Sequence, residues 1–157
     1  MIAKLEVPYH QQNRDYTCGP ACLRMVLEYW SFQQDEVSLA MLCGTTLAGT
    51  GLAEITEAAQ KLGFKSEWKR NTKFSDLKTA LKRGIPAMVI VDARLLHDIE
   101  IPFPVGHMIV IVAIDANSIF YHDPEVGRER KISRQIFIQA WENLRKGMVI
   151  VWRQKEM

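Results

Sequence analysis

One cysteine of this chain lies where a loop is expected to become a helix. Gly19 and Pro20 follow Cys18, and apolar residues then recur at three-to-four spacing to about Trp30, which is typical of one buried helix face. Proline suits a first helical turn, since its missing N–H would have no partner within the helix. A thiol at a helix N-terminus meets the positive end of the helix dipole and free backbone N–H groups, and both favour the nucleophilic thiolate. This position therefore predicts a reactive cysteine.

The other two cysteines, Cys22 and Cys43, are interpreted as buried structural thiols, because free cysteine often packs as a small hydrophobic residue. The alternative is a metal site made from Cys18, Cys22 and a histidine, since residues four apart share a helix face. Two cysteines without a second pair are a weak pattern for a metal. We therefore expect no metal ion and no cofactor.

Four histidines are candidates for the base that would activate the thiol. His107 begins a stretch, residues 107–114, that is apolar on both alternating faces, as in the middle of a sheet covered on both sides. Rigid backbone would hold a ring there, as a positioned base requires. His97 and His10 are expected to be exposed in loops, so His122 is the main competitor of His107.

Asp123 is the candidate for the group that orients the base. A turn at residues 115–118 makes the next strand an antiparallel neighbour of the His107 strand, which brings Asp123 near the second ring nitrogen of His107. Strand alternation then turns His122 to the opposite side. The alternative is a turn residue, since Asp-Pro is a common turn dipeptide.

A glutamine side chain ahead of the cysteine could supply a neutral hydrogen-bond donor over the helix end. Gln12 lies six residues before Cys18, and Gln11 is its immediate neighbour. Such a donor would stabilise the negative oxygen that forms when a thiolate attacks a carbonyl. Spacing alone leaves both glutamines open.

Together these segments resemble papain-like cysteine peptidases of the bacteriocin-processing, double-glycine type. The likeness rests on the chain order glutamine, cysteine, histidine, aspartate, carried here by Gln12, Cys18-Gly19-Pro20-Ala21, Gly106-His107 and His122-Asp123-Pro124. Residues 36–64 also resemble the connecting helices of that family, so the likeness covers nearly the whole chain. The resemblance selects Gln12 over Gln11 and implies the catalytic roles of Cys18, His107 and Asp123.

The remaining patterns predict the α+β class, with a mostly helical first half and an antiparallel sheet in the second half. Helices are expected at residues 37–44, 52–62, 75–84 and 133–143, the last with Ile136 on its inner face. Strands are expected at 64–69, 87–91, 119–121 and 148–152. The resemblance implies a papain-like cysteine proteinase fold, in which the nucleophile helix packs on the C-terminal sheet. The length of 157 residues fits a single domain, 1–157.

Composition excludes several kinds of partner. Lys and Arg number 20 and Asp and Glu 18, without a long basic run, so nucleic acid is not expected as a partner. The first residues contain no apolar core of signal-peptide length, and no segment approaches the roughly 20 apolar residues of a membrane helix. An odd number of cysteines, 3 in all, favours a reducing compartment over a disulfide framework, and the cytoplasm is the expected location.

The resemblance implies a thiol protease that cleaves peptide or protein substrates, such as leader peptides after a double glycine, and a peptide-exporting transporter as partner in trans. Thr17 replaces the acidic residue that many transporter-linked members carry there. Other thiol acyl transfer, by an amidase or transglutaminase-like enzyme, is one alternative, and a catalytically silent leader-binding module is another. A narrow cleft would select glycine, and the side chains expected to narrow it are Tyr16, Trp30, Trp68, Phe103 and Trp141.

Overall fold

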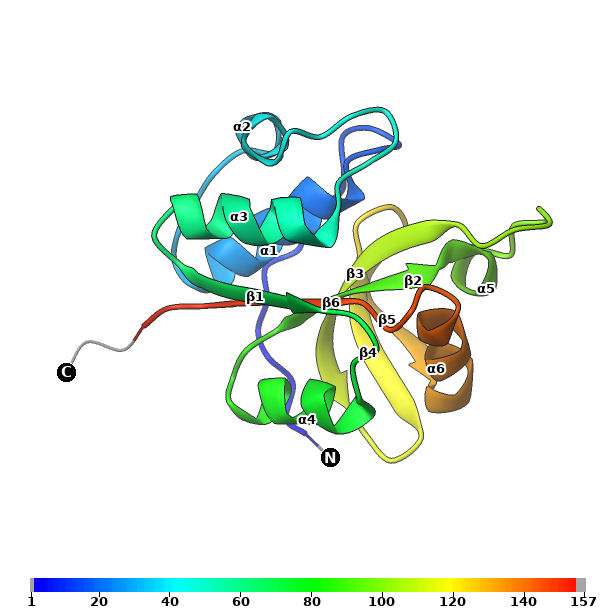
Figure 1. Ribbon diagram of the computed structural model, residues 1–157. Helices are drawn as coiled ribbons and strands as arrows, with labels where there is room; N and C mark the ends of the chain where they lie inside the picture. The colour runs from blue at the N-terminus through cyan, green and yellow to red at the C-terminus, as the bar shows by residue number, and fades with distance from the viewer. Residues whose placement is uncertain (1, 155–157) are drawn as a thin grey trace.

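Helices cover both faces of an antiparallel sheet in the computed structural model, which describes residues 2–154 (Figure 1). The strands of this range are β1 (Lys65–Lys69), β2 (Ala87–Asp92), β3 (Gly106–Ile114), β4 (Ser118–Asp123), β5 (Gly127–Ser133) and β6 (Met148–Trp152). Its helices are α1 (Cys18–Tyr29), α2 (Glu36–Cys43), α3 (Leu52–Lys61), α4 (Phe74–Lys82), α5 (Ala93–His97) and α6 (Arg134–Glu142). The predicted α+β class is confirmed.

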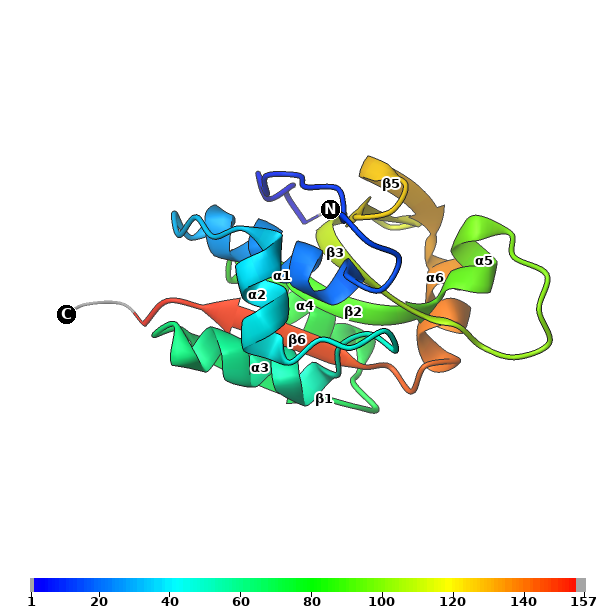
Figure 2. The same ribbon diagram turned by 90° about the horizontal axis from the view of Figure 1, so that it is seen from above.

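The predicted nucleophile helix forms α1 and packs against β3, with α2 and α3 beside it (Figure 2). Its apolar stripe is fully buried as far as Leu27, whereas Trp30 at its end is half-buried, and Pro20 lies in the first turn as expected. Gly44 ends α2 in the left-handed region, at a φ of 65°, which a residue without a Cβ adopts at little cost. The short helix predicted before Gly44 is therefore confirmed, including its end.

Strand β3 lies inside the sheet, whose strand order is β1-β6-β2-β3-β4-β5. Every residue of β3 after Gly106 is buried. Met108 and Val110 pack in the core beneath α1, α2 and α3, whereas Ile109 and Ile111 pack in the core on the other face. Burying each such side chain stabilises the fold by roughly 1.5–3 kcal/mol, so the strand that begins at the expected base is held rigidly on both sides.

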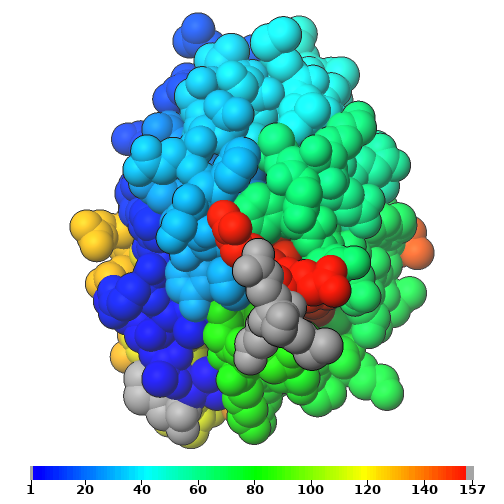
Figure 3. Space-filling view, turned by 90° about the vertical axis from the view of Figure 1, so that its left-hand side faces the viewer, coloured from blue at the N-terminus to red at the C-terminus, as the bar shows by residue number. Residues whose placement is uncertain are grey.

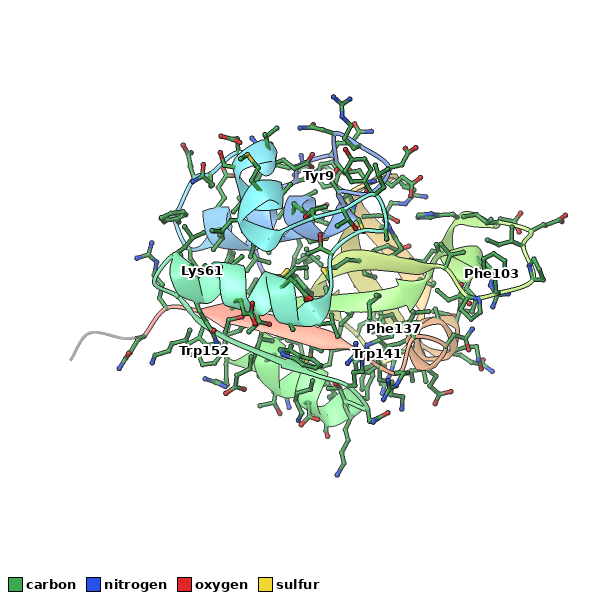
Figure 4. The ribbon with its side chains drawn as sticks, turned by 45° about the horizontal axis from the view of Figure 1, so that its top comes forward. Tyr9, Lys61, Phe103, Phe137, Trp141 and Trp152 are labelled. Carbon is green, nitrogen blue, oxygen red and sulfur yellow. The ribbon has the colours of Figure 1, made fainter. Side chains whose placement is uncertain are left out.

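Helix α6 closes the second core. The rings of Phe137 and Trp141 stack with centroids 5.4 Å apart and are fully buried (Figure 4). Ser133 caps the helix as expected, with its Oγ accepting the Ile136 N–H at 3.2 Å. The inward placement expected for Ile136 is wrong, because the buried stripe is centred on residues 137, 140 and 141 and leaves Ile136 46% exposed.

The sequence analysis missed two elements, β5 and α5. Strand β5 is an edge strand that pairs with β4, and most of its side chains are exposed and charged, so it lacks the apolar alternation by which strands are found. Helix α5 has five residues, too few to establish a helical period. Asp92 caps it by accepting the Arg94 N–H at 3.2 Å.

The end of β6 joins the first helix to the sheet. The Trp30 indole N–H donates to the Val151 carbonyl at 2.9 Å, and Arg153 Nε donates to the Trp30 carbonyl at 2.9 Å. In the space-filling view, the last part of the strand reaches the surface between the N-terminal helices and the segment from α3 onward (Figure 3). None of the helices in residues 2–154 has the length and apolar character that crossing a bilayer requires.

Candidate active site

The Cys18 thiol lies at the first residue of α1, beside the start of β3. Thr17 occupies the N-cap position, but its hydroxyl bonds with Arg14 instead of the helix, accepting the Arg14 N–H at 3.0 Å and donating to the Arg14 carbonyl at 2.9 Å. The loop before the cysteine is thereby fixed while the first N–H groups of the helix stay without a side-chain cap. These groups favour negative charge at the helix start.

Gly19 lets the first turn of α1 approach the start of α3. A Cβ at this position would lie 3.0 Å from Ile55 Cδ1 and 3.2 Å from Thr50 Cβ, closer than ordinary van der Waals contact. A larger residue would push the neighbouring Cys18 away from β3. The glycine after Cys18 is therefore explained by this close packing.

Burial and neighbouring charge act in opposite directions on the pKa of the Cys18 thiol. Burial raises its pKa, but the hydrogen bond and charge of His107, helped by backbone N–H groups of Met108 and Gly19, bring the pKa below its ordinary value. The arrangement favours the thiolate over the thiol more than an ordinary cysteine environment does. That ionised state is the one that attacks carbonyl carbon.

The other two cysteines differ from Cys18, as expected. Cys22 lies one turn further along α1, is fully buried, and donates its S–H to the Met108 carbonyl at 3.3 Å. Burial raises the pKa of Cys22 well above its ordinary value and that of Cys43 to about 11. Both thiols stay protonated and enclosed.

The antiparallel pairing of β3 with β4 brings His107 and Asp123 together, as the sequence predicted. His107 Nε2 lies 2.7 Å from Asp123 Oδ1, and the side chains are 6% and 1% exposed. Burial lowers the pKa of His107, but the bonds with Asp123 and Cys18 outweigh it and raise the pKa to about 10. Burial raises the pKa of Asp123, but the donors around it hold the pKa well below its usual range. Thiol, imidazole and carboxylate therefore form one connected series.

His122 is turned to the opposite side, as strand alternation predicted. Its Nε2 donates to the Val7 carbonyl at 2.8 Å, and its Nδ1 accepts the Glu129 N–H at 3.0 Å. Both ring nitrogens are therefore occupied by backbone groups. His10, expected to be exposed, is instead half-buried and bonded to Glu28.

The position predicted for His97 is wrong. This residue was expected to be exposed in a loop, but its side chain is only 10% exposed and its Nε2 lies 2.6 Å from Asp123 Oδ2. The reason is α5, which starts at the cap residue Asp92 and folds the chain back toward the site. An aspartate at a possible N-cap was the signal available in the sequence.

Gln12 is held at the corner that follows Asp123, because its backbone N–H donates to the Pro124 carbonyl at 2.8 Å. Its side-chain Nε2 donates to the Arg14 carbonyl at 2.8 Å, so one of the two amide hydrogens is already used. Its Oε1 is buried and has no hydrogen-bond partner within residues 2–154. The amide is thus held by one bond, and turning it costs little.

A family model, described as the Peptidase_C39 like family, matches residues 4–149 of this chain. The chain belongs to this family. Curated relatives include the lactococcin-A transport/processing ATP-binding protein LcnC of Lactococcus lactis, 29% identical over 137 residues. The chain is also 30% identical over 130 residues to an uncharacterized protein of Methanothermobacter thermautotrophicus, a match that covers 80% of both chains. The lactococcin match covers 87% of this chain but only 18% of that relative's length.

Solved structures of double glycine motif protease and peptidase domains show that this member of the Peptidase_C39 like family has the same fold as those domains. A double glycine motif protease from an AMS/PCAT transporter, solved in complex with the leader peptide, superposes with a TM-score of 0.78 at 21% identity over 97% of this chain and 95% of that one. The peptidase domain of Streptococcus ComA gives 0.72 at 23% identity, over 92% and 97%. The predicted fold and family are confirmed.

Beside the loop before Cys18 of this Peptidase_C39 like chain lies a hollow of about 590 Å³. Tyr16 and Thr17 line it on the loop side, and Val37, Ala40 and Met41 line it from α2. Val37 is 64% exposed and Met41 79% exposed. Apolar side chains thus face solvent immediately next to the candidate site.

The aromatic residues expected to narrow the cleft are mostly elsewhere. Tyr16 borders the hollow, but Trp141 is buried in the core on the far face, and Phe103 is 60% exposed on the loop after α5 (Figure 4). Trp68 is 40% exposed on β1, and Trp30 is bonded to β6. Of the five aromatic residues expected to narrow the cleft, all within the described residues 2–154, Tyr16 alone lines this hollow.

His97, His107 and Asp123 offer the donor types of a metal site, with ligand atoms within 4.8 Å of one another. Two ligands on one zinc ion lie roughly 3.3 Å apart, given bond lengths of about 2.0–2.1 Å and tetrahedral geometry. The nitrogen-to-oxygen distances here are 2.6 and 2.7 Å, which fit shared protons. The suggested ligand pair of Cys18 and Cys22 does not converge either, since Cys22 is bonded to β3.

Proposed function

We propose that this chain, as a single peptidase domain over residues 1–157, is a cysteine peptidase in which Cys18 is the nucleophile, His107 the base and Asp123 the orienting carboxylate. The observation that supports it is the connected series of thiol, imidazole and carboxylate at the start of α1. A binding module has no use for a buried carboxylate that fixes an imidazole against a thiol with a lowered pKa.

The chemistry follows from these contacts. The Cys18 thiolate attacks the carbonyl carbon of the scissile peptide bond, which forms a C–S bond and a negative oxygen. Because Nε2 of His107 donates to Asp123, its Nδ1 holds the proton taken from the thiol and gives it to the leaving nitrogen as the C–N bond breaks. Water then attacks the thioester and passes a proton to Nδ1. The C–S bond breaks, and thiolate and a carboxylic acid product are released.

Gln12 is proposed as the donor to the negative oxygen, together with the Cys18 backbone N–H. Two hydrogen bonds support this role, since they tie Gln12 to the corner after Asp123 and to the loop before Cys18. The amide has one hydrogen beyond its bond to Arg14, and rotation of the amide breaks one hydrogen bond only. Donors of this kind stabilise the tetrahedral intermediate strongly.

The substrate class we propose is a peptide with small residues before the scissile bond, such as the double glycine of a leader peptide. The relatives support this, since they are named as transport and processing proteins and as a double glycine motif protease. The hollow with exposed Val37 and Met41 could hold apolar side chains of such a peptide. A peptide-exporting transporter acting in trans is the proposed partner.

Three matched peptides test the proposal, with Gly-Gly, Ala-Gly or Phe-Arg ahead of the same scissile bond. We expect cleavage of the Gly-Gly peptide, weaker cleavage of Ala-Gly and none of Phe-Arg, measured by mass spectrometry of the products. Cys18→Ala is the control that must abolish cleavage. Preference for Phe-Arg would reject the small-residue substrate but not the thiol chemistry.

Two alternatives are separated by the same assay. A transglutaminase-like enzyme would pass the acyl group from Cys18 to an amine, so adding an amine acceptor would yield an amide in place of the acid product. An amidase would hydrolyse a non-peptide amide and leave all three peptides intact. A silent leader-binding module would bind the peptide without forming a thioester on Cys18. Intact-mass analysis after rapid acid quenching distinguishes these outcomes.

A further inference from the structure

Asp123 is shared between two histidines. Its Oδ1 accepts the His107 Nε2–H at 2.7 Å and also the backbone N–H groups of Glu125 and Val126 at 2.9 and 3.3 Å. Its Oδ2 accepts the His97 Nε2–H at 2.6 Å. The proposed mechanism uses the bond at Oδ1 and leaves the bond at Oδ2 without a role.

The second histidine, His97, is held in place by the surrounding structure. The His97 side chain is 10% exposed, and its ring meets the His107 ring edge-on, with centroids 4.8 Å apart and planes at 63°. It ends α5, whose cap residue Asp92 is fully buried and bonded to Arg94 and Asn143. The short helix is therefore anchored at its start, and it lies where β2 ends and β3 begins (Figure 1).

The protonation state of Asp123 fixes how the two rings are used. Donors around the carboxylate hold its pKa well below its usual range, so it is ionised and can only accept hydrogen bonds. Both His97 and His107 must then donate from Nε2. The rings differ at the other nitrogen, since Nδ1 of His97 lies 3.4 Å from the exposed Glu125 carboxylate, whereas His107 is bonded to Cys18.

We propose that His97 is a positioning residue that holds Oδ2 of Asp123, so that the plane of the carboxylate keeps Oδ1 in line with the His107 ring. This inference rests on the proposed function of Cys18 and His107. Without the second donor the carboxylate can tilt about its last side-chain bond, because the remaining donors all act on Oδ1. A tilted carboxylate would bind the imidazolium less well and so weaken the thiolate at Cys18.

His97→Phe tests this, since it keeps a ring against His107 but removes the donor, and His97→Gln restores an amide N–H. The readout is the rate of Cys18 alkylation by iodoacetamide across pH 5–10, which does not require a peptide substrate. For His97→Phe we expect the midpoint to move to higher pH by about one unit, so that labelling is about tenfold slower at pH values below the wild-type midpoint. His97→Gln should recover most of the loss, and kcat on a cleaved peptide should fall more than KM rises.

His10→Phe is the matched control, because His10 is also bonded to a carboxylate, that of Glu28, outside this cluster. It should leave the labelling profile unchanged. An unchanged profile for His97→Phe overturns the proposal, and so does a shift to lower pH, which would mean that His97 competes with His107 for Asp123.

Circular dichroism establishes whether each variant folds. Should His97→Phe not fold, His97→Gln is compared with His97→Asn, whose amide ends one carbon further from Oδ2; equal profiles for these two would reject the positioning role. A wild-type Cys18 that labels only at alkaline pH would count against the proposed function itself, which separates the two failures.

Discussion

Strands β3 and β4 hold two buried histidines whose surroundings differ in kind. His107 is bonded to the carboxylate of Asp123 and to the Cys18 thiol, groups that gain and lose protons. His122 is hydrogen-bonded at both ring nitrogens to backbone groups, and backbone groups do not gain or lose protons near neutral pH. As whole residues, His107 and His122 are 5% and 1% exposed, so burial does not distinguish the proposed base from a histidine that is held by backbone groups. The chemical nature of the groups bonded to each ring distinguishes the two histidines.

The same difference appears in the direction of each pKa. Burial lowers the pKa of His107, but its ionisable partners more than reverse this. Burial lowers the pKa of His122 too, and its backbone partners do not compensate, so the ring stays neutral. The surroundings of His107 therefore stabilise the protonated ring, whereas those of His122 favour the neutral ring.

The strongest test of this contrast replaces each ring by alanine. His107→Ala should reduce peptide turnover by about 10⁴-fold or more while the protein stays folded, because the thiolate loses its partner and the leaving group its acid. His122→Ala should leave the turnover of folded protein nearly unchanged and cost about 1–3 kcal/mol in the free energy of unfolding, since two buried backbone groups lose their partner. Steady-state kinetics and denaturant titration measure both. The contrast would be broken by a folded His122→Ala protein without activity.

A second test separates the two adjacent glutamines. Gln12→Ala should lower kcat by about 10²- to 10³-fold, the usual cost of losing one donor to the negative oxygen, with little change in Cys18 labelling. Gln11→Ala is the matched control and should change neither. Equal losses in the two variants would mean that the loop, and not the Gln12 amide, sets the rate.

A third test follows the thiol directly. Iodoacetamide at pH 7 should label Cys18 rapidly and spare Cys22 and Cys43, whose burial raises their pKa values. In His107→Ala, burial of Cys18 is no longer opposed by the ring, and labelling should slow by up to about 10²-fold, because a thiol with a pKa of about 9 is roughly 1% ionised at pH 7. Peptide mapping by mass spectrometry identifies the site. First labelling at Cys22 would reject the assignment of the nucleophile.

The smallest expected effect concerns stability against pH. The folded pKa of His122 lies below its ordinary 6.5, so the unfolded chain binds more protons and stability falls as the pH drops through and below 6.5. His107 has the opposite sign, since its folded pKa is raised to about 10: its contribution is complete below 6.5 and is lost as the pH rises through 10. Asp123 contributes above 3.8 and loses its contribution as the pH falls below that value.

His122→Gln isolates the first of these terms, because glutamine does not titrate. Between pH 6.5 and 5 its free energy of unfolding should fall less steeply than that of the wild type, by at most about 1.4 kcal/mol per pH unit, the limit for one proton. Denaturant titration at each pH measures the slope. Parallel slopes for variant and wild type would show that His122 binds its proton with the same pKa in the folded and the unfolded chain, and would contradict the lowered pKa.

The sequence predicted the elements with a clear period and missed those without one. The buried face of α1 and the two-sided burial of β3 follow from where apolar residues recur, and the turn before β4 follows from its residue types, so the meeting of His107 with Asp123 was predictable. Helix α5 is too short for a period, and the place of His97 depends on contacts of Asp92 with distant residues such as Asn143. Such long-range contacts leave no local pattern.

The site joins residues that lie far apart in the sequence, as the hydrogen bond from the Gln12 N–H to the Pro124 carbonyl illustrates. This has a consequence for how the protein is made. A ribosome synthesises Cys18 early, but the strands with His107 and Asp123 only after most of the chain has emerged. Until then the cysteine is an ordinary thiol with an ordinary pKa. The lowered pKa of Cys18 therefore requires the folded chain, and a growing or truncated polypeptide without His107 carries Cys18 as an ordinary, less reactive thiol.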